Sequence, residues 1–139
     1  MKIILKAGNF ENREVSMKEV TAVVRPNKMS TTKDALDKIG FPAMTAIPVL
    51  GKGKQRGISG ELNFYIQPRL LAKRYSTGMK YIPKRLLSIV VNDEDVDLVV
   101  KTIIEVNQTA QIGDGRIFVE PIDDVIRIRT GEKGELSLK

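Results

Sequence analysis

Apolar and β-branched residues gather in short runs separated by turn-forming residues, which is the pattern of β-strands. Pro48 lies within one run and removes a ladder hydrogen bond, so we expect that strand at a sheet edge or at a bulge. Pro121 is expected to end another strand. The runs predict strands at residues 20–25, 44–50, 85–91 and 117–119, and a final short strand at 125–129.

Two segments show the 3.6-residue period of an amphipathic helix. The first runs from Thr32 to Ile39, ends at Gly40, and has Ser30, Thr31 or Thr32 as its N-terminal cap. The second follows a cap at Asn92 or Asp93. Its unbroken apolar stripe consists of Val96, Val99, Val100, Ile103 and Ile104.

The order of elements is strand-helix-strand, a long loop, and strand-helix-strand again. Two such units in tandem, with their helices on one face, predict a ferredoxin-like α+β sandwich. The other face of the sheet would stay bare, which favours self-association in a chain of 139 residues. Residues 1–16 show no clean period, and we interpret them as an N-terminal extension, with an extra strand at Lys2–Lys6, outside a domain of residues 17–139.

Two glycines flank an acid near the C-terminal part of the chain, in the order Gly113, Asp114, Gly115, and Arg116 follows. Glycine can take positive φ and expose its N–H group, and successive exposed N–H groups beside an arginine form a concave anion site. On the strand expected at 125–129, Arg127 and Arg129 would share one face. Loop and strand together predict a grip on the phosphates of a nucleotide. A plain turn and a solvated strand face are the alternatives.

The composition limits the kinds of catalytic and metal-binding site that the chain could form. Apolar residues make up 42% and charged residues 29% of the chain, as in folded globular proteins, and no apolar run could span a membrane or form a signal-peptide core. Cys and His are absent, which excludes disulfides, a serine triad and the usual zinc ligands, whereas Mg²⁺ held largely by substrate phosphates stays open.

Charge is unevenly placed along the chain. The net charge is +6, but nine bases and one acid lie between Lys52 and Arg85, so the remaining residues carry −2. The basic segment predicts an anionic partner, which would be a nucleotide, a nucleic acid or an acidic protein surface.

Several short blocks occur in a fixed order in this chain. They are Met17-Lys18-Glu19-Val20, Arg25-Pro26, residues 40–45, residues 51–57 (GKGKQRG), Pro83-Lys84, Gln108-Thr109, residues 113–119 and residues 126–132. Together they span residues 17–132 and resemble the PII nitrogen-signalling proteins. The resemblance implies a ferredoxin-like trimer that binds ATP or ADP in the clefts between subunits and senses 2-oxoglutarate through Mg-ATP.

By position, the resemblance also implies a site. The nucleotide would contact Val23, Thr45, Gly51, Lys54, Val90, Gly113, Asp114, Gly115, Arg116, Arg127 and Arg129, with Val23, Thr45 and Val90 around the adenine. Residues 52–84 correspond to a mobile T-loop. The contacts implied for 2-oxoglutarate are Gly53, Gln55, Arg56, Gly57, Lys84 and Gly113, and Gln55 would also bind the Mg²⁺ shared with ATP and 2-oxoglutarate.

The chain departs from the enteric-type members in its T-loop, which is longer. Its tyrosines do not sit at the modified position, so we do not expect uridylylation, and Ser88 replaces an acid that could pair with Arg56. The long basic loop with residues 42–45 and 51–57 resembles the NifI subgroup, which switches off nitrogenase under nitrogen sufficiency. This implies a cytoplasmic regulator rather than an enzyme. It would form a homotrimer or mix with a PII paralogue, act on a nitrogenase component and bind no nucleic acid, and it would not be an integral membrane protein.

Other functions stay open. A PII protein could instead regulate glutamine synthetase or an ammonium transporter. A nucleic-acid-binding ferredoxin-like domain is disfavoured because the sequence offers no aromatic pair on the sheet face. An acylphosphatase-like enzyme is disfavoured because no catalytic Arg and Asn arrangement emerges, although a slow incidental ATPase activity would be compatible with the family.

Overall fold

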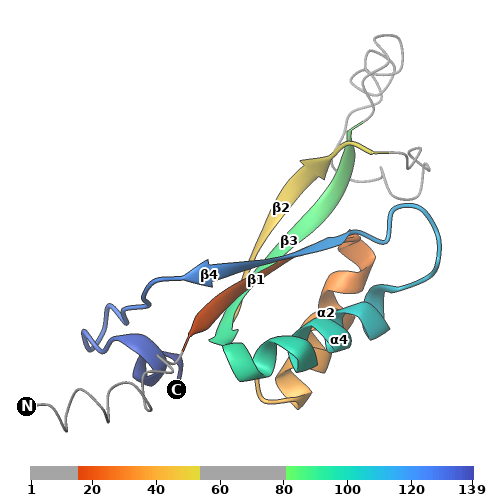
Figure 1. Cartoon of the computed structure of the whole chain (residues 1–139). Helices are drawn as coiled ribbons and strands as arrows, with labels where there is room; N and C mark the ends of the chain where they lie inside the picture. The colour runs from red at the N-terminus through yellow and green to blue at the C-terminus, as the bar shows by residue number, and fades with distance from the viewer. Residues whose placement is uncertain (1–15, 54–80) are drawn as a thin grey trace, which may run out of the picture.

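The computed structural model describes residues 16–53 and 81–139. They form a four-stranded antiparallel sheet in the order β2-β3-β1-β4, with two helices on one face (Figure 1). This arrangement confirms the ferredoxin-like α+β sandwich. The elements are β1 (Met17–Val24), α2 (Met29–Lys38), β2 (Thr45–Gly51), β3 (Ile82–Asn92), α4 (Val96–Asn107) and β4 (Arg116–Ile122), with 3₁₀ turns at Pro26–Lys28, Asp93–Asp95 and Gly134–Leu138.

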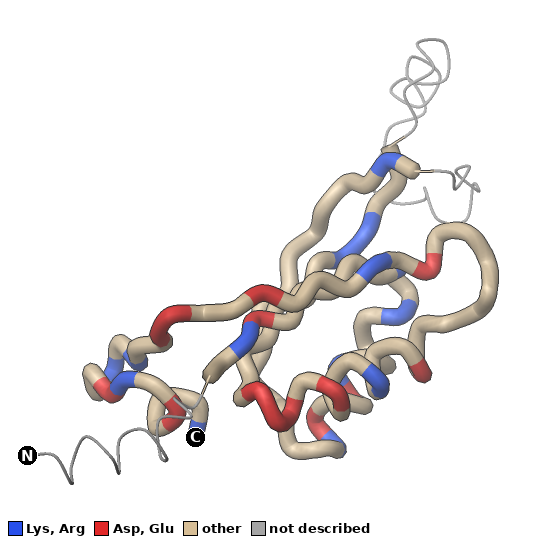
Figure 2. The backbone as a smooth tube through the Cα atoms, in the orientation of Figure 1, with Lys and Arg blue, Asp and Glu red and all other residues tan. Residues whose placement is uncertain are grey.

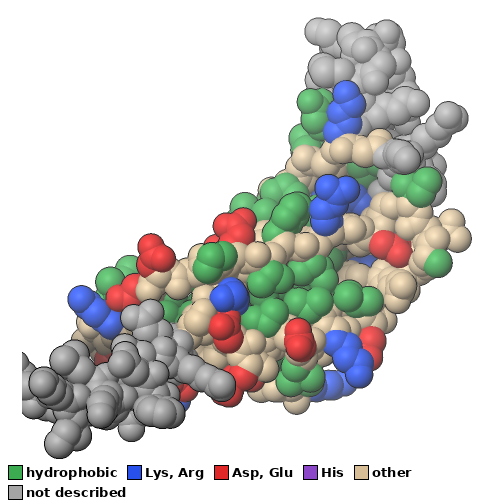
Figure 3. All heavy atoms as spheres, viewed as in Figure 1, with side chains coloured by type: hydrophobic (Ala, Val, Ile, Leu, Met, Phe, Trp, Pro, Cys, Tyr) green, Lys and Arg blue, Asp and Glu red, His purple; other side chains and the backbone are tan. Residues whose placement is uncertain are grey.

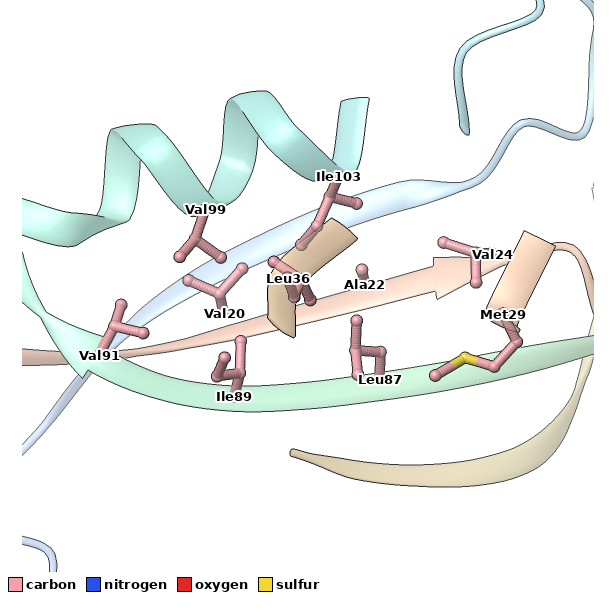
Figure 4. Packing of buried hydrophobic residues seen from close by; sticks show 10 residues of the cluster. All are labelled: Val20, Ala22, Val24, Met29, Leu36, Leu87, Ile89, Val91, Val99 and Ile103. Atoms are coloured by element: carbon pink, nitrogen blue, oxygen red, sulfur yellow. The ribbon is translucent and has the colours of Figure 1, made fainter. Parts of the chain in front are cut away.

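The core lies between the sheet and the two helices. Alternate residues of β1 point at the helices, and the antiparallel register places Val20 opposite Ile89 and Ala22 opposite Leu87 on the same face (Figure 4). Fully burying one such side chain contributes about 1.5–3 kcal/mol. The cluster consists of Val20, Ala22, Val24, Met29, Leu36, Leu87, Ile89, Val91, Val99 and Ile103.

The opposite face of the sheet is the one we call the bare face. Thr21 and Val23 alternate with the core residues of β1 and therefore point to it. Phe118 lies opposite Thr21 on β4 and Ile47 opposite Leu86, and 44% of Phe118 and 47% of Ile47 are exposed. None of the described helices covers this face (Figure 1), as the sequence predicted.

Three prolines lie inside strands. Pro48 belongs to β2, which pairs only with β3 among the described strands, so the predicted edge position is confirmed. Pro83 lies near the start of β3, before the pairing with β1 begins at Arg85. The prediction that Pro121 ends its strand is wrong, because β4 continues to Ile122; an edge strand tolerates the missing donor.

Helix α2 starts earlier than predicted. It follows the 3₁₀ turn Pro26–Lys28 and begins at Met29, so Ser30, Thr31 and Thr32 lie inside the helix and none of them caps it. Thr32 donates instead to the Lys28 carbonyl at 2.7 Å. The end of the helix is as predicted: Gly40 takes φ +94°, and its N–H and that of the next residue bond to carbonyls of the last turn.

Helix α4 begins after an acidic 3₁₀ turn, Asp93–Asp95, and acidic residues gather there (Figure 2). Their charge is favourable at a helix N-terminus. Asn92 holds the N-terminal cap position of this 3₁₀ turn and Asp95 that of α4, and neither side chain makes a capping hydrogen bond, so the predicted helix cap at Asn92 or Asp93 is wrong. The Lys18 ammonium bonds to Asp93 at 2.8 Å and lowers the pKa of that carboxyl. Of the predicted stripe, Val99 and Ile103 are buried, whereas 43% of Ile104 is exposed.

The predicted strand at 125–129 does not form. Residues 125–129 contribute one isolated bridge, between Ile126 and Lys133, and a turn follows. A strand needs a continuous neighbour, and after Ile122 the chain leaves the sheet (Figure 1). Ile128 is 100% exposed. The expectation that Arg127 and Arg129 share one strand face is therefore wrong.

Candidate functional site

A cavity of about 590 Å³ opens where β2 ends and β3 begins, beside residues 112–115, which we call the glycine bend. We call this space the first cavity. It brings together segments far apart in the sequence. The predicted site residues that line it are Val23, Gly51, Gly53, Lys84, Gly113, Gly115 and Arg116; Lys52, Ile82, Ile112 and Phe118 complete the described lining.

The charges around the first cavity all have one sign. Lys52, Lys84 and Arg116 line it, and no Asp or Glu does so among the described residues. Cations grouped around a concave surface raise the local concentration of anions. Apolar side chains, including Ile82 and Phe118, form other parts of its wall. The first cavity therefore suits a ligand with an anionic part and a flat or apolar part.

Lys84 connects the two sides of this cavity, which are the start of β3 and the glycine bend. It is only 7% exposed, and its ammonium donates to the Gly113 carbonyl at 2.7 Å. The bond joins β3 to the glycine bend across 29 residues of sequence. The Lys84 ammonium is thus held in the wall of the first cavity, where it can attract an anionic ligand.

Gly115 is required by a close approach of two backbones. A Cβ at this position would lie 1.8 Å from the Val23 carbonyl oxygen, and the residue has φ +113°. Any other residue would force the glycine bend away from β1. The sequence predicted a special conformation at this glycine, and the structure supplies the packing reason.

The Asp114 carboxylate fixes the shape of the bend. It accepts hydrogen bonds from the Thr109 N–H at 2.7 Å, the Thr109 hydroxyl and the Ala110 N–H at 3.0 Å. The Arg25 guanidinium bonds to it at 2.5 Å and donates to the Ile112 carbonyl at 3.1 Å. We call Arg25, Thr109 and Asp114 the Asp114 latch.

The latch also sets the charge state of its acid. The Thr109 hydrogen bonds, with Arg25 beside them, hold the pKa of Asp114 far below its ordinary value. The side chain of Asp114, predicted to join the phosphate set, is thus occupied by donors from residues 109–110 and from Arg25. Arg25 and Thr109 were not predicted as site residues. Thr109 had a local signal, since it lies five residues before an acid, whereas Arg25 lies 89 residues from Asp114 and had none.

The second cavity, of about 410 Å³, contains the other part of the predicted adenine pocket. Thr45 and Val90 line it, together with Gly40, Phe41, Pro42, Ala43, Met44, Ser88, Ile89, Ser137 and Leu138. This described lining carries no charged side chain and shares no residue with the first cavity. The Ser88 hydroxyl, at its edge, donates to Glu19 at 2.6 Å. Within one chain, Thr45 and Val90 are therefore separated from Val23.

The two predicted arginines are also separated from the glycine bend. Arg127 and Arg129 line neither cavity, and the bend and residues 125–139 lie at opposite ends of β4 (Figure 1). Arg127 forms an ion pair with Glu132 at 2.8 Å and donates to main-chain carbonyls near the C-terminus. One chain alone thus does not bring these arginines to the glycine bend.

A third cavity, of about 400 Å³, lies on the helix side of the sheet between β4 and α4, where hydrophobic side chains gather (Figure 3). Asp114, Gly115 and Arg116 form its rim, and Val100 and Ile104 belong to its apolar wall. The remaining predicted residues, Lys54, Gln55, Arg56 and Gly57, lie outside the described residues. So do residues 1–15 of the predicted extension at 1–16, including the strand predicted at Lys2–Lys6, and most of the T-loop.

Comparison with known proteins identifies the family. The model of the family "Nitrogen regulatory protein P-II" matches residues 17–132. The structure is similar to that of Arabidopsis thaliana PII bound to citrate, with a TM-score of 0.67 and 33% identity, over 91% of this chain and 95% of that one. The chain belongs to the PII family of nitrogen regulatory proteins, and the family implies a trimer.

The similar proteins indicate the subgroup of the PII family to which the chain belongs. The chain is 90% identical over 123 residues to the "Nitrogen fixation nifHD1 region GlnB-like protein 2" of Methanosarcina barkeri, covering 88% of this chain and all of that protein. It is 54% identical over 119 residues to the "Nitrogen fixation nifHD region GlnB-like protein 2" of Methanobacterium ivanovii, covering 86% and 97%. These similarities support the predicted NifI subgroup. No helix in residues 16–53 or 81–139 is long and apolar enough to cross a membrane.

Proposed function

We propose that this protein is a signal transducer that binds ATP or ADP together with 2-oxoglutarate and thereby controls a target protein through its T-loop. The observation that carries the proposal is the first cavity, where the described base of the T-loop meets the glycine bend. A ligand at this place contacts the loop that would dock on the target. Such a ligand changes the loop only if it binds the two loop states with different affinity.

The two cavities have chemistry suited to the two ends of a nucleotide. Lys52, Lys84 and Arg116 favour phosphates in the first cavity, and the uncharged second cavity, with Thr45 and Val90, suits a base. Because these walls are separate within one chain, we infer that the site is composite. One copy would supply the first cavity, and its neighbour would supply the second cavity with Arg127 and Arg129.

The bare face supports this assembly. It carries exposed Ile47 and Phe118 beside half-buried apolar residues of β1 and β3. Covering such a surface with a second copy removes it from water, at about 25 cal/mol per Å² of apolar area. In the trimer implied by the family, the bare faces would meet, and the walls of neighbouring copies could then face one another. The assembly would be a homotrimer or a mixed oligomer with a PII paralogue.

The same cavity also fits a dicarboxylate. Lys84 is a buried cation at its wall, and a carboxylate forms a strong charge-assisted hydrogen bond with an ammonium. The similar Arabidopsis protein was crystallised with citrate, which is likewise a polycarboxylate. The citrate supports the ligand class without fixing the ligand of this chain.

A bound Mg²⁺ would neutralise charge between the phosphates and the carboxylate. The described residues contain no group of three or more acidic side chains that could hold a metal. This composition fits an ion held largely by the ligands themselves, with Gln55 as the protein ligand that the family resemblance implies. Gln55 lies outside the described residues.

For the target, we propose a nitrogenase component. The names of the nifHD-region relatives support this choice over glutamine synthetase or an ammonium transporter. A pull-down from native extract with and without ATP and 2-oxoglutarate tests it. We expect a nitrogenase component to be captured without the ligands and released by them; capture of a different enzyme would replace this target.

Calorimetric titration tests ligand binding directly. We expect ATP to bind, and 2-oxoglutarate to bind more tightly when Mg-ATP is present than when it is absent. If neither ATP nor ADP binds the assembled protein, the proposed function is wrong. Strongly salt-dependent binding to oligonucleotides instead would favour a nucleic-acid-binding domain.

A further inference from the structure

The last residues of the chain contact two features assigned above to the nucleotide site. The 3₁₀ turn Gly134–Leu138, which we call the C-terminal turn, lies beside the end of β3. It is held there in part by a hydrogen bond of 3.4 Å from the Asn92 amide to Glu135. The turn is therefore packed against the sheet by a contact that spans 43 residues.

The first contact is with Arg127. Its guanidinium donates to the carbonyls of Leu136 at 3.4 Å and Ser137 at 3.1 Å, and to that of Lys139. The other terminal nitrogen of the guanidinium bonds to Glu132. The donors that a phosphate would require are thus engaged by the C-terminal turn and its flanking residues.

The second contact is with the second cavity. Ser137 and Leu138 line it together with Thr45 and Val90, although they lie far from both in the sequence. Leu138 is an apolar side chain in the space that we assign to the base. One short segment therefore touches both the base cavity and the phosphate-binding arginine.

We propose that the C-terminal turn is an internal competitor for the nucleotide, so that binding of ATP displaces residues 134–139 from Arg127 and from the second cavity. The inference rests on the proposed function. Arg127 cannot direct the same N–H groups to carbonyls and to a phosphate, and a phosphate offers an ionised acceptor with bidentate geometry that a neutral carbonyl lacks. Release of the C-terminal turn from Arg127 is therefore favourable when a bound nucleotide replaces its carbonyls with a phosphate, and unfavourable when no nucleotide is bound.

The competition has a measurable size. If the displaced turn is a minor state with a population of about 10%, the apparent affinity for ATP falls to about one tenth of its intrinsic value. A chain that ends after Lys133 keeps Arg127 and Glu132 but lacks the turn. We expect this truncated chain to bind ATP about tenfold more tightly than the full chain.

The test combines calorimetry with hydrogen exchange on the assembled protein. ATP affinity is measured for the full chain, the chain ending after Lys133, Leu138→Ser, and the matched control Leu98→Ser, which changes an exposed leucine on α4. Amide exchange of residues 134–138 is followed with and without saturating ATP. Leu138→Ser keeps the test valid if the truncated chain folds poorly.

We expect tighter binding for the truncated chain and for Leu138→Ser, no change for Leu98→Ser, and faster exchange in the turn when ATP is bound. Equal affinity of the full chain and both turn variants, or slower exchange with ATP, would overturn the inference while leaving the proposed function intact. Absence of ATP binding in every variant would overturn the proposed function, and the inference with it.

Discussion

The glycine bend and the C-terminal segment, residues 125–139, differ in how they are held, although the sequence predicted that both grip phosphate. The bend is fixed by long-range contacts: Lys84 to Gly113, Arg25 to Asp114, and the Gly115 backbone against Val23. The side-chain hydrogen bonds of Arg127 reach only residues within 12 positions, and Ile128 is fully exposed.

The difference shows which part of the site one chain completes. The bend contacts β1 and β3 and therefore has its shape before any ligand or partner arrives. In the C-terminal segment, residues 125–129 have one isolated bridge, Ile128 is fully exposed, and the turn at its end is tied to β3 by the 3.4 Å bond between Asn92 and Glu135. Changes in the bend should therefore alter the stability of the chain, and changes in the segment should mainly alter ligand binding.

The largest effect is expected at Gly115. Gly115→Ala places a Cβ 1.8 Å from the Val23 carbonyl oxygen in a backbone of positive φ, so we expect a loss of about 3 kcal/mol or more in the free energy of unfolding. Urea denaturation at fixed protein concentration measures it.

Gly131→Ala is the matched control. Gly131 also has positive φ, at +72°, but apart from Gly131 itself and its two chain neighbours no described residue has an atom within 4 Å of the place that its Cβ would take. Its loss should be about 1 kcal/mol, the cost of left-handed backbone alone. Equal losses for the two variants would show that the close approach to β1 does not matter.

The Asp114 latch comes next. Asp114→Asn removes the charge that accepts bonds from Thr109 and Arg25, and should lower the free energy of unfolding by about 2 kcal/mol. Asp93→Asn breaks an ion pair with Lys18 in which the acid is 50% exposed, so its effect should be smaller than that of Asp114→Asn. A larger loss for Asp93→Asn would contradict the role given to the latch.

The latch also predicts a dependence on pH. The pKa of Asp114 is lower in the folded chain than its ordinary value of 3.8, so its stabilisation is complete above that value and is lost as pH falls toward the lowered pKa. The stability gap between wild type and Asp114→Asn should therefore be constant from neutral pH to about pH 5 and narrow below about pH 4. Urea denaturation from pH 7 to pH 3 measures the gap, and a gap that widens with acid would refute this assignment. The acidic group at Asp93 is present in both proteins and cancels.

Stability should change least in the C-terminal segment. Arg127→Ala breaks the ion pair with Glu132, whose side chain is 43% exposed, and the hydrogen bonds to the C-terminal turn, and should lower the free energy of unfolding by less than Asp114→Asn does. Its ATP affinity should fall about tenfold or more, because a charge-assisted bond to phosphate is lost. Calorimetry measures this, with Lys101→Ala on α4 as the control that removes an exposed cation. Unchanged ATP affinity in Arg127→Ala would remove Arg127 from the site.

The sequence predicted the structure correctly where the residue type responds to its immediate neighbours in the chain, as in helix periodicity and helix ends. The period of Val99 and Ile103 predicted their burial, and Gly40 predicted the end of α2. The alternation of residues 125–129 predicted a strand, but alternation only says that one side could be covered; it does not supply a neighbouring strand. The prediction at Pro121 failed for a related reason, since a proline is tolerated where a strand has a free edge.

The sequence likewise predicted the part of the site that depends on local residue types, and missed the part that depends on contacts between distant segments. Glycines and cations carry a local signal for anion binding, and the first cavity brings together Gly51, Lys84, Gly113 and Arg116. The Arg25–Asp114 contact depends on two segments 89 residues apart, which no spacing rule connects. The division of the chain at residue 16 and the roles of Lys54, Gln55, Arg56 and Gly57 stay predictions.

The central claim is that two copies share each nucleotide site. Mixed assemblies of Arg116→Ala, altered beside the glycine bend, and Arg127→Ala, altered in the C-terminal segment, test it most directly by calorimetric titration with ATP. Each variant alone should bind ATP weakly. In a closed ring mixed randomly from equal amounts, a site is intact when an Arg127→Ala copy supplies the first cavity and an Arg116→Ala copy supplies the C-terminal segment. Tight binding should therefore return at about one quarter of the sites. Recovery of no tight sites in verified mixed assemblies would contradict a composite site.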